Sequence, residues 1–173
     1  MQLLSLKNLG NAMHLPIDIE VVKTYLKIDN SVEDDLLKTM ILSAANQCEE
    51  YAGVSLVIRE WSALFKCVSS KYEIILPKSP VENIVSIYGR YSDEKEYELN
   101  KKLYYLLDNR IILKQACSFT TIKVNFEAGY REKLIPCELK TSILEHVADM
   151  YENRNCCKSI LRERYKKFRG IRI

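Results

Sequence analysis

The sequence predicts an α+β protein, in which a helical bundle of two N-terminal helices and one long C-terminal helix carries an inserted antiparallel β block and a basic C-terminal arm. Two observations predict this fold class. Apolar residues recur at helical spacing before residue 52 and again after residue 137. Between about residues 55 and 127 they alternate instead, as in short strands. Strands that are segregated from helices along the chain indicate α+β rather than a doubly wound sheet.

Two helices are expected in the N-terminal part, over about residues 17–28 and 32–52. Asp18 is a candidate N-cap for the first, because a side-chain oxygen there can accept a backbone N–H of the first turn. The second carries a continuous apolar stripe, and Gly53 follows it at the position that favours a left-handed backbone. This second helix is the strongest local pattern in the chain.

The β block begins with "SLVIREWSALFKC", in which Trp61, Ala63 and Phe65 alternate with polar residues. Further strands are expected in "KYEIILP", "VENIVSIYG" and "FTTIKVNFEAGY". The stretch "YYLLDNRIIL" predicts a tight hairpin that turns at Asp108 and Asn109, since both residue types tolerate positive φ. The block therefore contains five or six short antiparallel strands.

Pro136 precedes a third helix, expected over about residues 137–153 with one apolar face. Residues 1–153 are predicted to form a single domain, and residues 154–173 a basic docking arm. The arm has eight basic residues and one acid, a net charge of +7, whereas the 18 basic and 22 acidic residues of the rest give −4. Charge concentrated at one end favours an anionic partner surface there.

The composition is typical of a globular protein that spans no membrane. Apolar residues make up 47% of the 173, and no apolar run approaches the roughly 20 residues of a membrane helix. The N-terminus lacks the pattern of a signal peptide. The six cysteines are scattered without CxxC spacing, so they are expected to be reduced thiols in a cytosolic compartment.

No catalytic, cofactor or metal constellation is recognisable. The acidic pairs Asp34-Asp35 and Glu49-Glu50 are helical neighbours, whose side chains point about 100° apart and do not converge. His146 lies near acidic residues of its own helix but has no nucleophile beside it, and no glycine-rich phosphate loop occurs. We expect no enzyme activity, no cofactor and no metal site.

The basic arm offers no obvious surface on its own chain to pack against, yet large apolar residues are interleaved with its charges. A frayed terminus is the plain alternative. An arm that orders on a partner is favoured, and either a nucleic-acid backbone or an acidic protein groove fits it. The candidate docking residues are Arg154, Lys158, Arg162, Arg164, Tyr165, Lys166, Lys167, Phe168, Arg169 and Arg172.

Three segments between residues 17 and 154 together resemble the head–tail connector (adaptor) family of long-tailed bacteriophages and gene transfer agents. They are "IDIEVVKTYLKIDNSVEDDLLKTMILSAANQCEEYAGVSLVIREW", "ILPKSPVENIVSIYG" and "NFEAGYREKLIPCELKTSILEHVADMYENR". Their order and spacing match the family's opening helices, its Leu-Pro-x-x-Pro-Val segment, and its closing helix that ends in Tyr-x-Asn-Arg.

The resemblance implies a structural virion protein that is assembled in the bacterial cytoplasm. It implies a dodecameric ring at the head–tail junction, which joins the portal to the next tail-side (stopper) protein. DNA would pass through the lumen without sequence-specific binding. A small nucleic-acid-binding module that acts through the basic tail is the alternative from a different class. For a connector, deleting residues 155–173 is expected to abolish portal association and leave the core folded. For the alternative, DNA affinity is expected to fall steeply with salt and to vanish on the same deletion.

Overall fold

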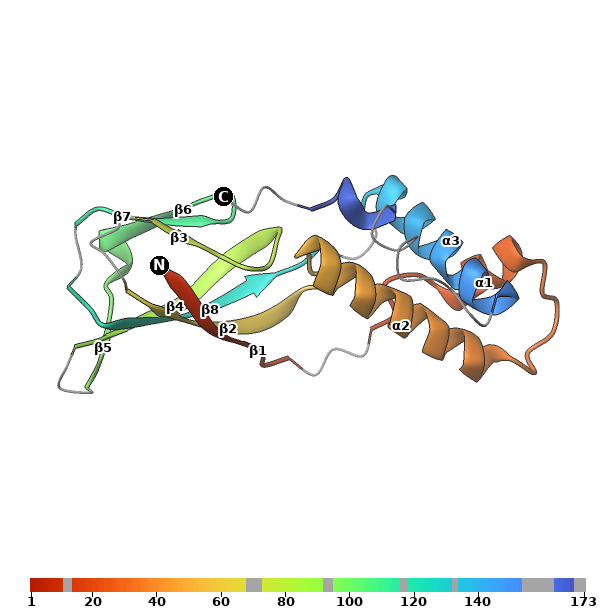
Figure 1. The fold of residues 1–173 in the computed structure, drawn as a ribbon, viewed down its shortest axis with the longest axis horizontal. Coiled ribbons are helices and arrows are strands. Elements are labelled where there is room, and N and C mark those ends of the chain that lie inside the picture. The colour runs from red at the N-terminus through yellow and green to blue at the C-terminus, as the bar shows by residue number, and fades with distance from the viewer. Residues whose placement is uncertain are drawn as a thin grey trace. The chain divides into compact units, whose positions relative to one another are not determined.

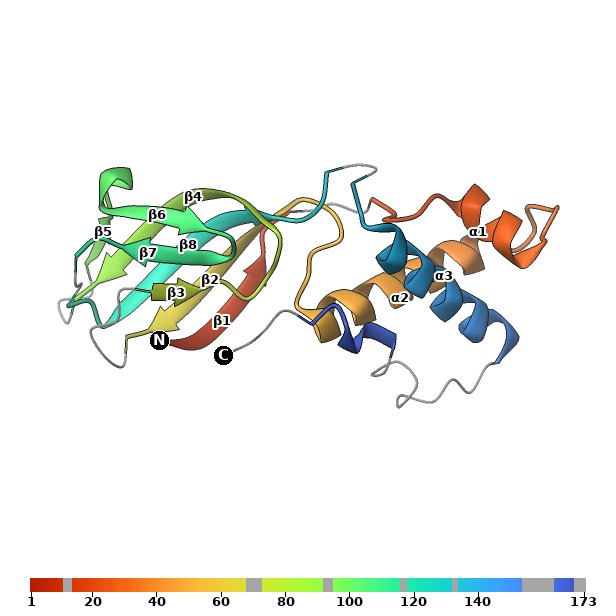
Figure 2. The same ribbon diagram turned by 90° about the horizontal axis from the view of Figure 1, so that it is seen from above.

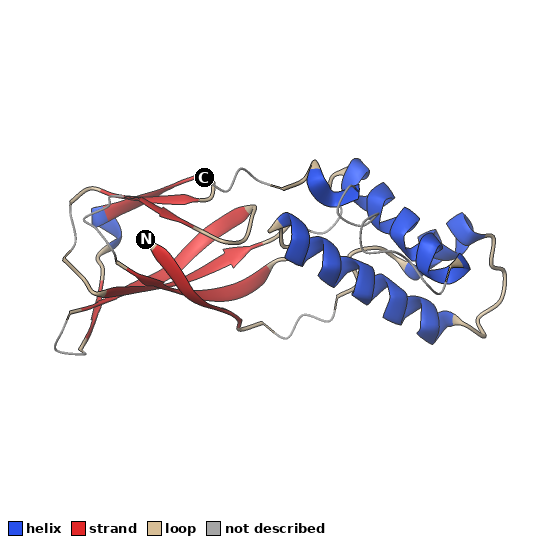
Figure 3. Ribbon diagram, in the orientation of Figure 1, coloured by secondary structure: helices blue, strands red, loops and turns tan. Residues whose placement is uncertain are grey.

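The computed structural model describes residues 1–10, 14–67, 73–91, 95–115, 118–131, 134–153 and 164–169. The chain divides into two compact units, each built from separate stretches of sequence. The β unit comprises Met1–Ala12 and Ile58–Gly129, and the helical unit comprises Met13–Val57 and Tyr130–Ile173. Figure 3 shows strands in the first unit and the long helices in the second. The mixed composition with antiparallel sheets is as predicted, while a single domain over residues 1–153 stays a prediction.

The β unit contains two antiparallel sheets, which are stacked on each other in Figures 1 and 2. The first has the order β1-β2-β8-β4-β5 and the second the order β3-β7-β6. The strands are β1 (Gln2–Asn8), β2 (Arg59–Lys66), β3 (Glu73–Ile75), β4 (Val81–Arg90), β5 (Glu96–Glu98), β6 (Tyr104–Leu107), β7 (Arg110–Leu113) and β8 (Thr121–Ala128). A short 3-10 turn, η1 (Lys101–Leu103), precedes β6.

Alternating side chains of the two sheets enclose the core of the β unit. Every second residue of β8 is buried, and Trp61 on β2 lies directly opposite Phe126 on β8. Trp61 is only 7% exposed, and Lys78 places its ammonium 5.0 Å from the centre of the indole ring. The predicted hairpin is confirmed, because Asp108 has φ 54° at the turn between β6 and β7. The expected strand pattern thus builds one apolar layer between two sheets.

Strand β1 was not predicted from the sequence. It pairs antiparallel with β2, from Gln2 opposite Lys66 to Asn8 opposite Trp61, and a bulge interrupts the register between Leu3 and Ser5. An edge strand exposes much of both faces, and a bulge breaks the two-residue period. Its alternation is therefore too weak to recognise without the partner strand, which lies about fifty residues further along the chain.

The helical unit is formed by α1 (Ile19–Leu26), α2 (Asp34–Ala52) and α3 (Cys137–Glu152), all within the predicted ranges. Asp18 caps α1, since its carboxylate accepts the backbone N–H of Glu20 at 3.1 Å. Gly53 ends α2 with φ 71°, the left-handed conformation that glycine adopts at least cost. Local sequence signals therefore set these helix ends.

The three helices share one apolar core. Leu37 and Ile41 of α2 and Ile143 and Val147 of α3 are completely buried in it. Glu49 is buried beside them, and its carboxylate accepts the backbone N–H of Leu56 at 2.8 Å, which holds the chain that leaves α2. Helical stability here depends on packing of the amphipathic faces more than on the propensity of isolated helices.

Candidate interaction site: the C-terminal segment on α3

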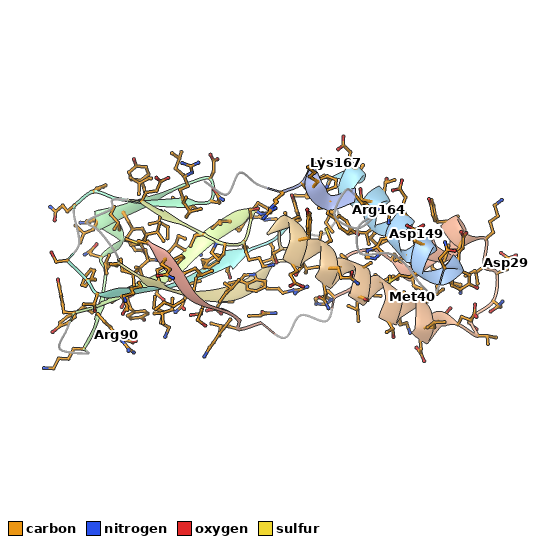
Figure 4. The ribbon with its side chains drawn as sticks, in the orientation of Figure 1. Asp29, Met40, Arg90, Asp149, Arg164 and Lys167 are labelled. Atoms are coloured by element: carbon orange, nitrogen blue, oxygen red, sulfur yellow. The ribbon has the colours of Figure 1, made fainter. Side chains whose placement is uncertain are left out.

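Six of the ten predicted docking residues lie in the described segment 164–169, which we call the C-terminal segment. Its first three residues are helical, and it belongs to the helical unit. Figure 4 labels Arg164 and Lys167 where the segment lies along α3. The other four candidates, Arg154, Lys158, Arg162 and Arg172, fall outside the described residues.

Tyr165 anchors the C-terminal segment in the helical core. Its side chain has no exposed surface, and its hydroxyl lies 3.0 Å from Nδ1 of His146 on α3. The two rings meet edge to face with centroids 5.8 Å apart. Burial, helped by the nearby charge of Arg164, lowers the pKa of His146 to about 4, so the imidazole is neutral and Nδ1 can accept the hydroxyl proton. Burial likewise raises the pKa of Tyr165, which keeps the hydroxyl protonated.

Ion pairs fix the segment on an acidic flank of α3, formed by Glu138, Glu145 and Asp149. Nη2 of Arg164 lies 2.6 Å from Oδ2 of Asp149, and its Nε lies 3.5 Å from Oε2 of Glu145. The Arg164 side chain is only 14% exposed, so these pairs are better shielded from solvent than ordinary surface pairs. Lys167 reaches Glu138 at 3.6 Å in a more exposed pair, which contributes little.

The end of the segment adds weaker contacts. Phe168 packs partly against the helical core, and the Lys167 ammonium lies 4.9 Å from the centre of its ring. The Arg169 guanidinium lies 5.7 Å from the centre of the Tyr51 ring on α2. Lys166, Lys167 and Arg169 are exposed. The segment thus has an inner side that holds it on its own chain and an outer side that presents cations.

The expectation that this segment has no surface of its own chain to pack on is wrong for residues 164–169. Tyr165 is a core residue, and Arg164 is bound to α3. Sequence reasoning treated His146, Glu145 and Asp149 only as neighbours on one helix. The available signal was the spacing of the acids at 138, 145 and 149, which places them on one flank, together with an Arg-Tyr pair downstream. The docking role of the ten candidates stays a prediction.

The described residues contain no cluster of three or more His, Cys, Asp or Glu side chains that could hold a metal ion. Among the helices in the described part of the chain, none combines the length and apolar character needed to cross a membrane. The arrangement on α3 provides a neutral imidazole, a protonated phenol and ion pairs, all of which serve to hold the segment in place.

Comparison with known proteins identifies the family. The family described as phage gp6-like head-tail connector protein matches residues 16–105, more than half of the chain. The chain belongs to this family. It is therefore a structural connector of a phage-like particle, and the family is not a class of enzymes. The matched residues include α1, α2, strands β2 to β5 and the start of β6, whereas β1, α3 and the C-terminal segment lie outside them.

Solved structures share the fold of this connector at low sequence identity. A chain in the neck of an empty gene transfer agent (GTA) particle, computed with C6 symmetry, is 15% identical with a TM-score of 0.79. A chain in the virion of a native GTA particle is also 15% identical, with a TM-score of 0.78. A chain in the neck of a native GTA particle, computed with C12 symmetry, is 16% identical with a TM-score of 0.72. Each alignment covers 98% of this chain and 97% of the other. A search of curated proteins finds no match.

Proposed function

We propose that this connector forms a ring in the neck of a tailed phage or gene transfer agent particle, after assembly in the host cytoplasm. The ring joins the portal to the stopper protein on the tail side, and DNA passes through its lumen without sequence-specific binding. Family membership, together with a fold match over nearly the full length of neck proteins, carries this proposal. The C6 and C12 symmetries of those necks support a dodecamer, since twelve subunits satisfy both.

The C-terminal segment is proposed as the grip on the portal. Arg164 and Tyr165 hold the segment on α3, and Lys166, Lys167 and Arg169 face outward. Three exposed cations within four positions fit an acidic groove on a partner protein. In this arrangement, the anchored residues position the cations and contribute no direct contact. The candidate cations outside the described residues extend the same grip.

Charge reversal tests this grip better than deletion, because deleting residues 155–173 removes the core residue Tyr165. The variant Lys166→Glu/Arg169→Glu changes only exposed side chains. Lys101→Glu/Lys114→Glu makes the same charge change on exposed residues of the β unit and is the matched control. We expect the first variant to keep its circular dichroism but to lose co-sedimentation with the portal protein of the same genome, and the control to keep both. Equal binding by the two variants refutes the grip.

The same variants separate the connector from the nucleic-acid-binding alternative. A module that binds phosphates with this segment loses DNA affinity steeply as salt increases, and again when Lys166 and Arg169 are reversed. Salt-sensitive DNA binding that is lost in the variant, with portal binding unchanged, would establish the alternative. Electron microscopy of necks tests the ring directly.

A further inference from the structure

An apolar groove lies between α1 and α3, away from the C-terminal segment. It consists of two adjoining hollows of about 420 Å³ and 410 Å³, and both are lined by Val21 of α1 and Leu144 of α3. Tyr25 lines one hollow and Lys140 the other. The floor is therefore aliphatic and aromatic, with Lys140 at one rim. Two carboxylates also line the groove, Asp18, which caps α1, and Glu20, which lies 3.8 Å from Lys23.

The groove exposes large side chains that the helical core does not use. Val21 and Tyr25 are each 48% exposed, although the adjacent Val22 is 1% exposed in the core. Residues four positions apart on a helix share a face, so Val21 and Tyr25 form one outward stripe on α1. Single exposed apolar residues are common, but a hollow lined by several of them marks an interaction surface.

The groove and the C-terminal segment use opposite flanks of α3. Successive residues of a helix are rotated by about 100°, which places Lys140 and Leu144 across the core-facing side from Glu138 and Glu145. The segment binds the flank of Glu138 and Glu145. Within the described residues, the flank of Lys140 and Leu144 has no element lying over it other than α1, which forms the other wall of the groove.

A second apolar patch lies on the same unit, where α2 begins. Val32 is 89% exposed and Leu36 is 48% exposed, again four positions apart. We call this pair the α2 ridge. Between them, Asp35 has a side chain that is 99% exposed, and its one ion pair within the described residues is with Lys38 of its own helix. Asp34, one residue earlier, instead turns toward α1 and meets Lys23 at 3.1 Å.

The groove and the α2 ridge are complementary, because both are apolar and their edges carry opposite charges. The groove is concave and apolar, with Lys140 at its rim, and Lys140 has no ion-pair partner among the described residues. The ridge is apolar and exposed, with Asp35 beside it. An interface between two different patches of the same chain is heterologous, and it produces a closed ring when its rotation closes.

We infer that the α1–α3 groove of one subunit receives the α2 ridge of a second copy of this chain, with Asp35 approaching Lys140 at the edge. This inference rests on the proposed ring and names the surfaces that build it. Every subunit then donates one ridge and accepts one ridge. Burial of four large apolar side chains per contact supplies the attraction, and the charge pair selects the orientation.

Cysteine crosslinking in assembled necks tests the contact. The variant Tyr25→Cys/Leu36→Cys places one thiol in the groove and one on the ridge, at exposed positions where neither change opens the core. Oxidation is expected to give a ladder of covalent oligomers on a non-reducing gel. Tyr25→Cys alone and Leu36→Cys alone are the controls, and all three variants also carry Cys137→Ser, because the exposed Cys137 lines the same groove.

The outcomes separate the inference from the proposed function. Necks that contain rings but give no ladder beyond the single-cysteine controls overturn the groove–ridge contact and leave the connector role intact. A disulfide between two copies of the residue-25 thiol, identified by mass spectrometry in the Tyr25→Cys variant, shows a groove-to-groove contact and also overturns it. If electron microscopy shows no rings, the proposed function fails and the inference falls with it.

A charge swap provides an independent measurement. Asp35→Lys and Lys140→Glu are each expected to reduce ring assembly on the portal several-fold, and the double variant is expected to recover part of the loss. Rescue requires the two residues to meet across the interface, because within one chain they lie on different helices with other neighbours. Additive losses in the double variant overturn the pairing.

Discussion

Acidification is expected to destabilise the helical unit through His146. The imidazole is 1% exposed, and burial lowers its pKa to about 4 from the ordinary 6.5. Because the folded pKa lies below the unfolded one, the unfolded chain binds the extra proton between these values. The stabilisation is complete above about pH 6.5 and is lost as the pH falls towards 4. Relative to neutral pH, the free energy of unfolding is lower by about 2 kcal/mol at pH 5 and by about 3 kcal/mol at pH 4.

Urea unfolding at several pH values measures this effect. Far-ultraviolet circular dichroism follows the helices, while fluorescence of Trp61, the single tryptophan, follows the β unit. His146→Gln is the control, since the two proteins differ only in the imidazole. The free energy of unfolding of the wild type should fall by about 2 kcal/mol more than that of the variant between neutral pH and pH 5. Parallel pH profiles for the two proteins would refute the reasoning.

Three further substitutions test the described contacts. Tyr165→Phe removes the hydroxyl that meets His146 and should cost about 1–3 kcal/mol in the helical transition, because Nδ1 is left buried without its partner; an unchanged midpoint contradicts the anchor. Trp61→Ala should cost about 3–5 kcal/mol by circular dichroism, since the ring is almost fully buried, and a wild-type melting curve would argue against this core. Gly53→Val should lower the melting temperature, because φ is 71° there and a β-branched residue resists it, whereas Gly53→Asn should be milder.

Elements whose signals are local could be predicted from the sequence. Asp18, Gly53 and Asp108 act through their own backbone or the next few residues, and the structure places each at the predicted helix end or turn. The apolar stripe of α2 identified its buried face in the same way. Strand β1 was not predicted, because a bulge interrupts its alternation and the strand depends on pairing with the distant β2.

The candidate site was only partly predictable. The concentration of positive charge near the C-terminus predicts contact with a partner, which stays a prediction, and the contact that the structure describes is with the protein's own helix. Nothing in the local pattern distinguishes Tyr165, which is buried, from Phe168, which is half-buried, since both lie among cations. The distinction arises from His146 and Asp149, whose positions on α3 become relevant only after the segment folds back.

The position of Tyr165 also has a consequence for protein synthesis. The hydrophobic centre of the helical unit includes Tyr165, which lies thirteen positions beyond Glu152, the last residue of α3. Translation must therefore have passed residue 165 before that centre can close, and a product cut short before this point leaves an apolar hole beside His146. Chains truncated before Tyr165 are therefore expected to have a destabilised helical unit and a shorter lifetime in the cell.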